Sequence, residues 1–257
     1  MTEASREPAH GRIDVHTHLL PAIDDGCASV ADSMRCARML VDAGYTHAFC
    51  TPHIWPSLPG NNIASIPPRV AQLQSHLDKN EIPLRLLSGG ELNLHAMWPA
   101  IQRWPRDQIV TFALAGKYVL FDFWAKCMDD CRDALHAGAA YLKSLELTPI
   151  LAHPERIMAL QDDPAEIDAL RDAGVLLQMN LWCLTEPAGS PIYRTAKKLL
   201  EDGKYFMFGT DCHNPESLPR SIEGLEIARA IMGDAFVDTM TITNPRRLIS
   251  RERVKAD

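Results

Sequence analysis

Histidines and carboxylates recur in this sequence directly after short apolar runs. Imidazole nitrogens and carboxylate oxygens together suit Zn, Mn or Fe, whereas carboxylates alone suit Mg or Ca. In an H-x-H pair on a strand both rings project to the same side, because alternate residues share a face. Eight or nine such ligands are too many for one ion, so we expect two or three metals bridged by carboxylates. The groups are HTH (16–18), DDG (24–26), TPH (51–53), GGE (89–91), Asp122, HPER (153–156) and DCH (211–213).

Each of these groups also has a purely structural explanation. An H-x-H pair alone is a weak signal, and Asp25 before a glycine is typical of a turn. Asp122 would serve equally as a buried salt-bridge partner, and Asp211 and His213 as caps of the helix that follows Ser217. The joint occurrence of these groups at six strand ends favours a metal site over the separate explanations.

Arg156 is the main candidate for contact with a substrate. It follows His153 by three residues, so it is held near the metals. Its planar guanidinium offers a fork for two phosphate oxygens. The alternative is a structural ion pair with Glu155 or Asp162. Arg220, in the loop after His213, is a second candidate for substrate binding.

The elements that must position these residues follow a regular rhythm of apolar run, polar loop and helical pattern. This alternation predicts an α/β fold with a mostly parallel sheet, as a single-domain distorted (β/α)7 TIM-like barrel, with an open doubly wound sheet as the alternative. We expect a tail over 1–11, one domain over 12–257, and an irregular segment with one or two short helices over 92–116. The expected strands are 12–16, 46–51, 84–89, 117–123, 148–153, 174–180 and 204–210. The expected helices are 28–43, 67–79, 129–145, 164–173, 190–202 and 220–233.

Composition excludes several classes of protein. The chain has 257 residues, is 46% hydrophobic and carries a net charge of −7, which argues against a nucleic-acid partner. Seven cysteines without CxxC pairs indicate reduced thiols in a cytoplasmic protein. We expect no signal peptide and no membrane insertion, since no apolar run reaches the roughly 18 residues of a membrane span.

Other catalytic motifs are absent. No cysteine is followed six positions later by arginine, so the C-x5-R loop of thiol-based phosphatases is missing. The sequence also lacks G-x-S-x-G, G-x-G-x-x-G and P-loop patterns. Water activated by metals is the chemistry that remains, and paired metals suit the in-line displacement of a phosphate ester.

The motifs IDVHTHLLPAIDDG, CTPH, GGELN, LAHPERI, QMN, GTDCHN and NPRRLI resemble the PHP (polymerase and histidinol phosphatase) superfamily in order and spacing. They are most similar to its capsule-associated branch, the CpsB/CapC-type protein-tyrosine phosphatases, over residues 12–250. The resemblance implies a seven-stranded distorted barrel and a trinuclear manganese-type site, with Fe or Zn as alternatives. It also implies action on the tyrosine-rich tail of a bacterial tyrosine kinase that controls capsule or exopolysaccharide export.

Carried over by position, the resemblance implies nine metal ligands and a substrate arginine at Arg156. Asp122 stands where this branch commonly has Glu, and the motif leaves open whether Asp24 or Asp25 faces the metal. The segments 55–66 and 92–105 differ from the family pattern and are expected to line the substrate entrance. The implied ligands are His16, His18, Asp25, His53, Glu91, Asp122, His153, Asp211 and His213.

The leading functional hypothesis is a protein-tyrosine phosphatase in which hydroxide supplied by the metals attacks phosphorus in line. Arg156, Asp211 and His213 would take part in catalysis. The alternatives are a small-molecule phosphatase such as histidinol-phosphatase, a metal-dependent nuclease or amidohydrolase, and a non-catalytic regulator. The sequence leaves oligomer formation open.

Overall fold

The computed structural model describes residues 11–249, and its strands pair in parallel throughout. One sheet has the order β1-β2-β4 and the other β3-β5-β6-β7-β8-β9. All seven predicted strands are present within a few residues of their expected bounds. The strands are β1 (Arg12–Thr17), β2 (Tyr45–Cys50), β3 (His53–Ile54), β4 (Arg85–Ser88), β5 (Glu91–Asn93), β6 (Tyr118–Asp122), β7 (Thr148–Ala152), β8 (Leu176–Asn180) and β9 (Met207–Gly209).

The two sheets are one ladder interrupted at matching positions. β2 continues into β3 after residues 51–52, and β4 continues into β5 after Gly89 and Gly90. The backbone amide of Gly89 donates to the Cys50 carbonyl (2.9 Å), and that of Glu91 donates to the Pro52 carbonyl (3.0 Å), so pairing runs across the break. A side chain at Gly90 would lie 2.9 Å from Val110, which explains the glycine.

The last strand returns to the first. A parallel bridge joins Thr17 to Cys212, and the amide of Asp211 donates to the His16 carbonyl (2.8 Å). The amide of His18 donates to the Cys212 carbonyl (2.9 Å). These contacts close the ring of parallel strands, and the predicted α/β barrel is confirmed over the open sheet.

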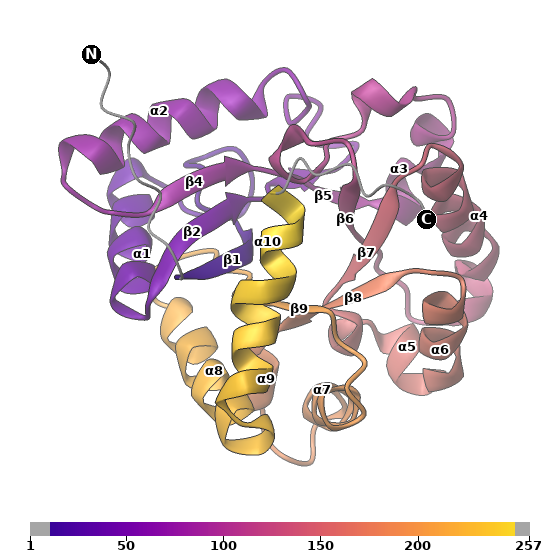
Figure 1. Cartoon of the computed structure of the whole chain (residues 1–257). Coiled ribbons are helices and arrows are strands. Elements are labelled where there is room, and N and C mark those ends of the chain that lie inside the picture. The colour runs from indigo at the N-terminus through magenta and orange to yellow at the C-terminus, as the bar shows by residue number, and fades with distance from the viewer. Residues whose placement is uncertain (1–10, 250–257) are drawn as a thin grey trace, which may run out of the picture.

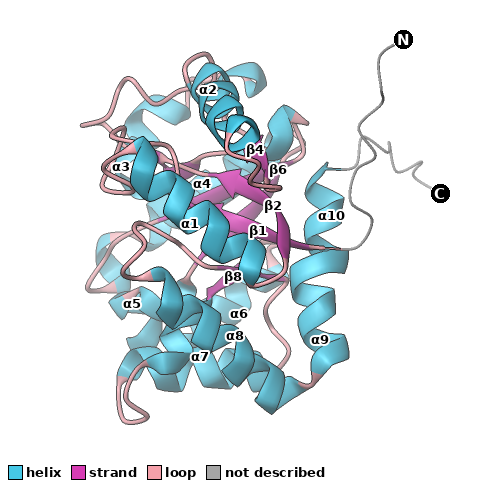
Figure 2. Ribbon diagram, turned by 90° about the vertical axis from the view of Figure 1, so that its left-hand side faces the viewer, coloured by secondary structure: helices cyan, strands magenta, loops and turns pink. Residues whose placement is uncertain are grey.

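The helices surround the strands, as Figures 1 and 2 show. Each predicted helix is present, and helix α1 is representative: the Ser29 hydroxyl accepts from the Asp32 amide at its start, and Gly44, at φ +84°, follows its end. The helices are α1 (Val30–Asp42), α2 (Ile66–Lys79), α3 (Leu94–Ile101), α4 (Arg132–Ser144), α5 (Met158–Asp162), α6 (Pro164–Asp172), α7 (Pro191–Glu201), α8 (Leu218–Met232), α9 (Asp234–Asp238) and α10 (Asn244–Ile249).

Two regions extend or correct the sequence-based expectation. The segment 92–116 contains α3 and two short 3-10 turns, as predicted. The helical stretch from α9 through a π-helical turn (Thr239–Thr243) to α10 was not predicted. Its sequence, VDTMTITN, is rich in β-branched residues that disfavour helices, so tertiary packing must hold it. In Figure 1 this stretch (yellow) crosses one end of the barrel.

The alternation of side chains in β6 explains how the barrel separates its interior from its helices. Tyr118 and Leu120 join a cluster with Phe49, Ile150 and Leu248 of α10, whereas Val119 and Phe121 face a larger cluster shared with the helices. Asp122 continues the Tyr118–Leu120 face, so its carboxylate is directed to the barrel interior.

The expected tail, residues 1–11, lies almost wholly outside the described residues, as do residues 250–257 at the end of the expected domain. Between residues 11 and 249, no helix combines the length and apolarity required to cross a bilayer.

Candidate metal centre

All nine predicted ligands gather at the carboxyl ends of the strands. Within residues 11–249 they fall into four overlapping groups whose donor atoms lie within 4.8 Å of one another. Several residues belong to two groups, which is the arrangement expected for more than one cation. The groups are His18, Asp25, His53 and His213; His16, His18 and Glu91; His16, His153 and Asp211; and His53, Glu91 and Asp122.

Glu91 lies at the centre of these groups. Its Oε2 is 2.8 Å from His53 Nδ1 and 3.4 Å from His16 Nε2, and its Oε1 is 2.9 Å from His153 Nε2. Asp211 occupies a similar place, with Oδ1 3.3 Å from both His16 Nε2 and His18 Nε2. Each carboxylate thus has the position of a bridging ligand.

Two neighbours orient the histidines at the end of β1, His16 and His18. Gln178 Oε1 lies 2.9 Å from His16 Nδ1, and Asp24 Oδ2 lies 2.9 Å from His18 Nδ1. Each contact directs the opposite nitrogen, Nε2, toward Glu91 and Asp211. Such partners fix the tautomer and the ring position of histidines that bind metals.

The two aspartates of the DDG motif have different surroundings. Asp24 is engaged by His18, and it also accepts hydrogen bonds from the amides of Gly26 (3.0 Å) and His53 (3.1 Å). Asp25 Oδ1 instead lies 3.2 Å from His53 Nε2 and 3.5 Å from His213 Nε2. Asp25 therefore belongs to a donor group, whereas Asp24 supports the ring of His18.

The potential at this site is negative. Burial lowers the pKa of His16, but the charges of Glu91 and Asp211 outweigh burial and raise this pKa. Burial likewise opposes protonation of His18, yet hydrogen bonds to Asp211 and Asp24 raise its pKa well above the ordinary value. A site that stabilises positive charge on two buried histidines also favours metal cations.

Asp122 provides the test of whether a cation fits. Its side chain is fully buried, and neither carboxylate oxygen has a hydrogen-bond partner. Burial, followed by the charge of Glu91, raises the pKa of Asp122 well above its ordinary value. Because a buried carboxylate without partners is costly, a bound cation beside Asp122 and Glu91 would satisfy the unpaired oxygens.

Two candidate ligands have unusual backbone conformations. His153 has φ +35° and Asp211 has φ +52°, in the left-handed region that costs a non-glycine residue roughly 1–2 kcal/mol. Hydrogen bonds from the His153 amide to the Gln178 carbonyl and from the Asp211 amide to the His16 carbonyl, both 2.8 Å, hold these conformations. Strain of this kind concentrates at functional sites.

Arg156 lies at the edge of the donor groups. Its Nη1 is 2.5 Å from Asp211 Oδ2, and its guanidinium lies over the rings of Trp124 (5.1 Å) and Trp182 (5.3 Å). The alternative pairing with Glu155 is not observed, since Glu155 accepts from the Asn180 amide (2.7 Å) and from the Tyr205 hydroxyl (3.0 Å) instead.

Arg220 is farther from the donor groups. It pairs with Glu186 (2.6 Å), bonds to the Thr185 hydroxyl (3.1 Å) and lies over the Trp182 ring at 5.1 Å. Trp182 therefore connects the two arginines that the sequence singled out.

Sequence reasoning missed several neighbours of the site. Asn180 Nδ2 donates to Asp211 Oδ2 (2.8 Å), and Gln178, two residues earlier on β8, contacts His16. The alternation within the QMN motif could have placed both on one face. In the Trp-rich segment 92–105, expected at the substrate entrance, Trp98 packs against Tyr141 of α4 and not against the donor groups.

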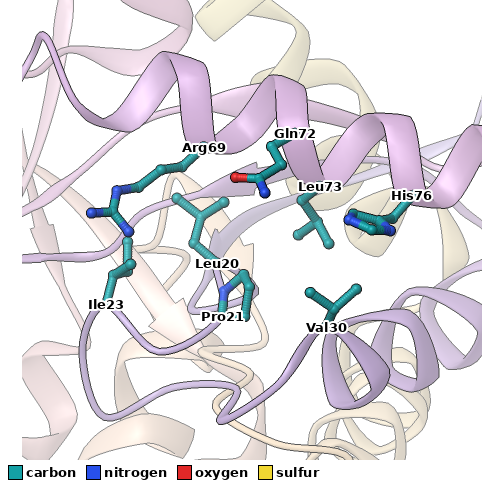
Figure 3. A pocket seen from close by; sticks show the side chains of 8 residues that line it. All are labelled: Leu20, Pro21, Ile23, Val30, Arg69, Gln72, Leu73 and His76. Carbon is teal, nitrogen blue, oxygen red and sulfur yellow. The ribbon is translucent and has the colours of Figure 1, made fainter.

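A separate cavity lies between the loop after β1 and helix α2. Figure 3 shows Leu20 and Ile23 of that loop opposite Leu73 and Arg69 of α2, and the volume of the cavity is about 60 Å³. None of the nine candidate ligands lines it. This cavity is therefore distinct from the metal centre.

A closed ring of parallel strands with histidines and carboxylates at their carboxyl ends is the architecture of metal-dependent barrel enzymes. Within this class, the family model described as "Capsular polysaccharide synthesis, CpsB/CapC" matches residues 12–250. The chain belongs to the CpsB/CapC family, and the resemblance seen in the sequence motifs is confirmed.

Characterised relatives and solved structures agree. The chain is 28% identical to the tyrosine-protein phosphatase YwqE of Bacillus subtilis over 79% of this chain and 77% of that protein. It is 24% identical to the tyrosine-protein phosphatase CpsB of Streptococcus pneumoniae over 92% and 98%. A solved structure from work on these two proteins, described as unique metal-dependent tyrosine phosphatases, covers 92% of this chain and 94% of its own, with 25% identity and a TM-score of 0.78. The phosphotriesterase homology protein of Escherichia coli (12% identity, 95% and 100% coverage, TM-score 0.51) shares the fold alone.

Proposed function

We propose that this chain is a metal-dependent phosphatase that hydrolyses phosphotyrosine on proteins. The observation that carries the proposal is the position of Arg156 beside the convergent donor groups, 2.5 Å from Asp211. YwqE and CpsB, which this chain resembles over most of its length, are named tyrosine-protein phosphatases. This family membership favours a phosphatase over a nuclease or an amidohydrolase.

The nine predicted ligands would hold two or three divalent ions. We propose Mn²⁺, with Fe or Zn as alternatives, because the donor set mixes imidazole with carboxylate. Asp25 rather than Asp24 would be the ligand from the DDG motif. When bound, such ions activate water near neutral pH and neutralise charge on the phosphoryl oxygens. Asp122, whose oxygens are unpaired, would complete the set in spite of its shorter side chain.

The residues around the ions would bind and orient the phosphate. Arg156 would direct its guanidinium to two phosphoryl oxygens, in place of the carboxylate oxygen of Asp211 that it contacts here. Asn180 would keep Asp211 oriented when Arg156 turns to the substrate. His213 remains neutral near pH 7, because burial and the charge of His18 lower its pKa, so its ring nitrogen is available as a ligand. Arg220 would contact the peptide around the phosphotyrosine.

The leaving group agrees with this site. Tyrosine has a pKa near 10, so its oxygen departs without the strong general acid that a serine alkoxide requires. We infer that the substrate is the tyrosine-rich tail of a bacterial tyrosine kinase in capsule or exopolysaccharide control. The seven free thiols favour a reducing compartment, so we propose action in the cytoplasm.

The test is an activity assay on metal-stripped protein re-metallated with Mn, Zn, Fe or Mg in turn. We expect hydrolysis of a phosphotyrosine peptide to disappear with the metal and to return best with Mn. Histidinol phosphate serves as the competing substrate, and a higher kcat/KM for it would favour the small-molecule phosphatase. Unchanged turnover in metal-free protein would refute the proposal, and re-metallated protein without any phosphatase activity would favour the regulator.

A further inference from the structure

Three tryptophans follow site residues at the same spacing. Trp55 comes two positions after His53, Trp124 two after Asp122, and Trp182 two after Asn180. Each pair spans the end of a different strand, β3, β6 or β8.

Trp124 and Trp55 stack on different histidines of the metal centre. The Trp55 ring lies 3.9 Å from the His53 ring at 21°, and the Trp124 ring lies 5.6 Å from the His153 ring at 29°. His53 and His153 contact different oxygens of Glu91, Oε2 and Oε1. Each indole therefore packs against a different histidine, and both of these histidines contact Glu91.

Trp124 has a free surface beside Arg156. Its side chain is 44% exposed, which makes it one of the large apolar residues within 11–249 that are not covered by the fold. The Arg156 guanidinium contacts its ring at 5.1 Å, whereas Trp182 supports the same guanidinium at 5.3 Å and is partly buried. An exposed indole next to the phosphate-binding group could contact the part of the substrate that carries the phosphate.

We propose, on the basis of the function proposed above, that Trp124 binds the aromatic ring of the substrate and thereby selects aryl over alkyl phosphomonoesters. Trp182 is a positioning residue, because it contacts Arg156 and Arg220 and acts through them. An offset or edge contact between the substrate ring and an indole strengthens binding by about tenfold at most beyond simple burial. An alkyl phosphate of equal charge gains none of this.

Binding of non-hydrolysable phosphonates separates this role from leaving-group effects. In Mn-loaded protein, Trp124→Ala should raise the Kd of phenylphosphonate, measured by calorimetric titration, about tenfold more than the Kd of methylphosphonate, because loss of the contact with Arg156 weakens both ligands alike. Trp124→Phe should restore most of the difference, with metal content measured in parallel. Trp182→Ala should raise both values equally, because it acts on the arginines.

Trp98→Phe is the matched control, since Trp98 packs on Tyr141 away from the donor groups and should change neither Kd. Equal increases in both Kd values for Trp124→Ala would overturn the proposal and reduce Trp124 to a support for Arg156. Failure of the proposed function is distinguished by the wild-type protein, which would then lack phosphatase activity, whereas calorimetry still gives the two Kd values.

Discussion

At the scale of single residues, Arg156 is held by a carboxylate and two indoles while its side chain remains one-quarter exposed. Burial opposes its charge, but Asp211 and further neighbouring groups together outweigh burial and raise the pKa of Arg156, so the guanidinium stays protonated. A permanent positive charge beside the candidate ligands is suited to a phosphoryl group.

Replacing Arg156 by Ala should therefore lower kcat/KM for a phosphotyrosine peptide by about 100-fold, the usual loss of one preorganised donor. Metal content, measured by mass spectrometry, should not change, because Asn180 still holds Asp211. Arg156→Lys should recover part of the rate, since it keeps the charge but not the fork. Wild-type kinetics in the alanine variant would remove Arg156 from the site.

The neighbouring aspartates should behave differently when each is changed to Asn. Asp24→Asn loosens the ring of His18 and should weaken metal affinity by roughly 10–100-fold, with activity restored at high metal concentration. Asp25→Asn removes a donor and should lower the number of ions bound, without such recovery. Calorimetric metal titration measures both, and the reverse pattern would make Asp24 the ligand.

Glu155 should make stability depend on pH. Burial raises its pKa from 4.5 to about 7, so between these values the folded protein holds a proton that the unfolded chain has lost. The unfolding free energy therefore falls as pH rises through this window, by on the order of 3 kcal/mol from this group. Glu155→Gln should remove that decrease.

Urea unfolding of chelator-treated wild type and Glu155→Gln at pH 5 and pH 8 checks this. The variant should gain stability relative to wild type at the higher pH. Parallel pH profiles for the two proteins would show that Glu155 does not titrate in this window.

At the scale of elements, the short 3-10 helix η5 (Leu181–Thr185) follows β8 and carries Trp182, which lies against Arg156 and Arg220. Helix α8 packs directly on η5 at Gly224, where an added Cβ would clash with the Leu181 carbonyl. This glycine allows helix and backbone to touch, and it thereby sets the position of Trp182 below the two arginines.

Gly224→Ala should destabilise the protein by about 1–3 kcal/mol through overpacking. It should also raise KM for the phosphopeptide, because η5 must move. Gly189→Ala is the control, since no atom lies within 4 Å of a Cβ added there. Thermal unfolding and steady-state kinetics measure the two effects, and a wild-type melting temperature for Gly224→Ala would contradict the close contact.

At the scale of the whole molecule, two apolar clusters hold the barrel without help from the site, one inside the strands and one beneath the helices. The metal centre adds buried charge at one end of this scaffold. Removal of metal should therefore lower stability without unfolding the chain.

We expect Mn²⁺ at about 100 times its Kd to stabilise the protein by about 2.7 kcal/mol per site, or several degrees in melting temperature. Far-ultraviolet circular dichroism after chelation should remain that of the folded protein. Loss of helical signal on chelation would show that the ions, and not the clusters, hold the barrel together. In Asp25→Asn the Mn²⁺-induced shift should be smaller.

The sequence alone determined seven of the nine strands of residues 11–249, most helices and the positions of the candidate ligands, because apolar periodicity is local and strand ends follow directly from it. His16, Glu91 and Asp211 could be assigned to one edge of a parallel sheet without coordinates. Only the tertiary structure decided that Asp24 supports His18 while Asp25 faces His53, and that Arg156 lies between Trp124 and Trp182. It also decided that the β-branched stretch 237–244 is helical. Leu248 of α10, which follows this stretch, packs into the cluster inside the barrel, and this tertiary contact is not visible in the local sequence. These pairings join residues distant in the chain, so they depend on strand register and barrel closure, which no local pattern encodes.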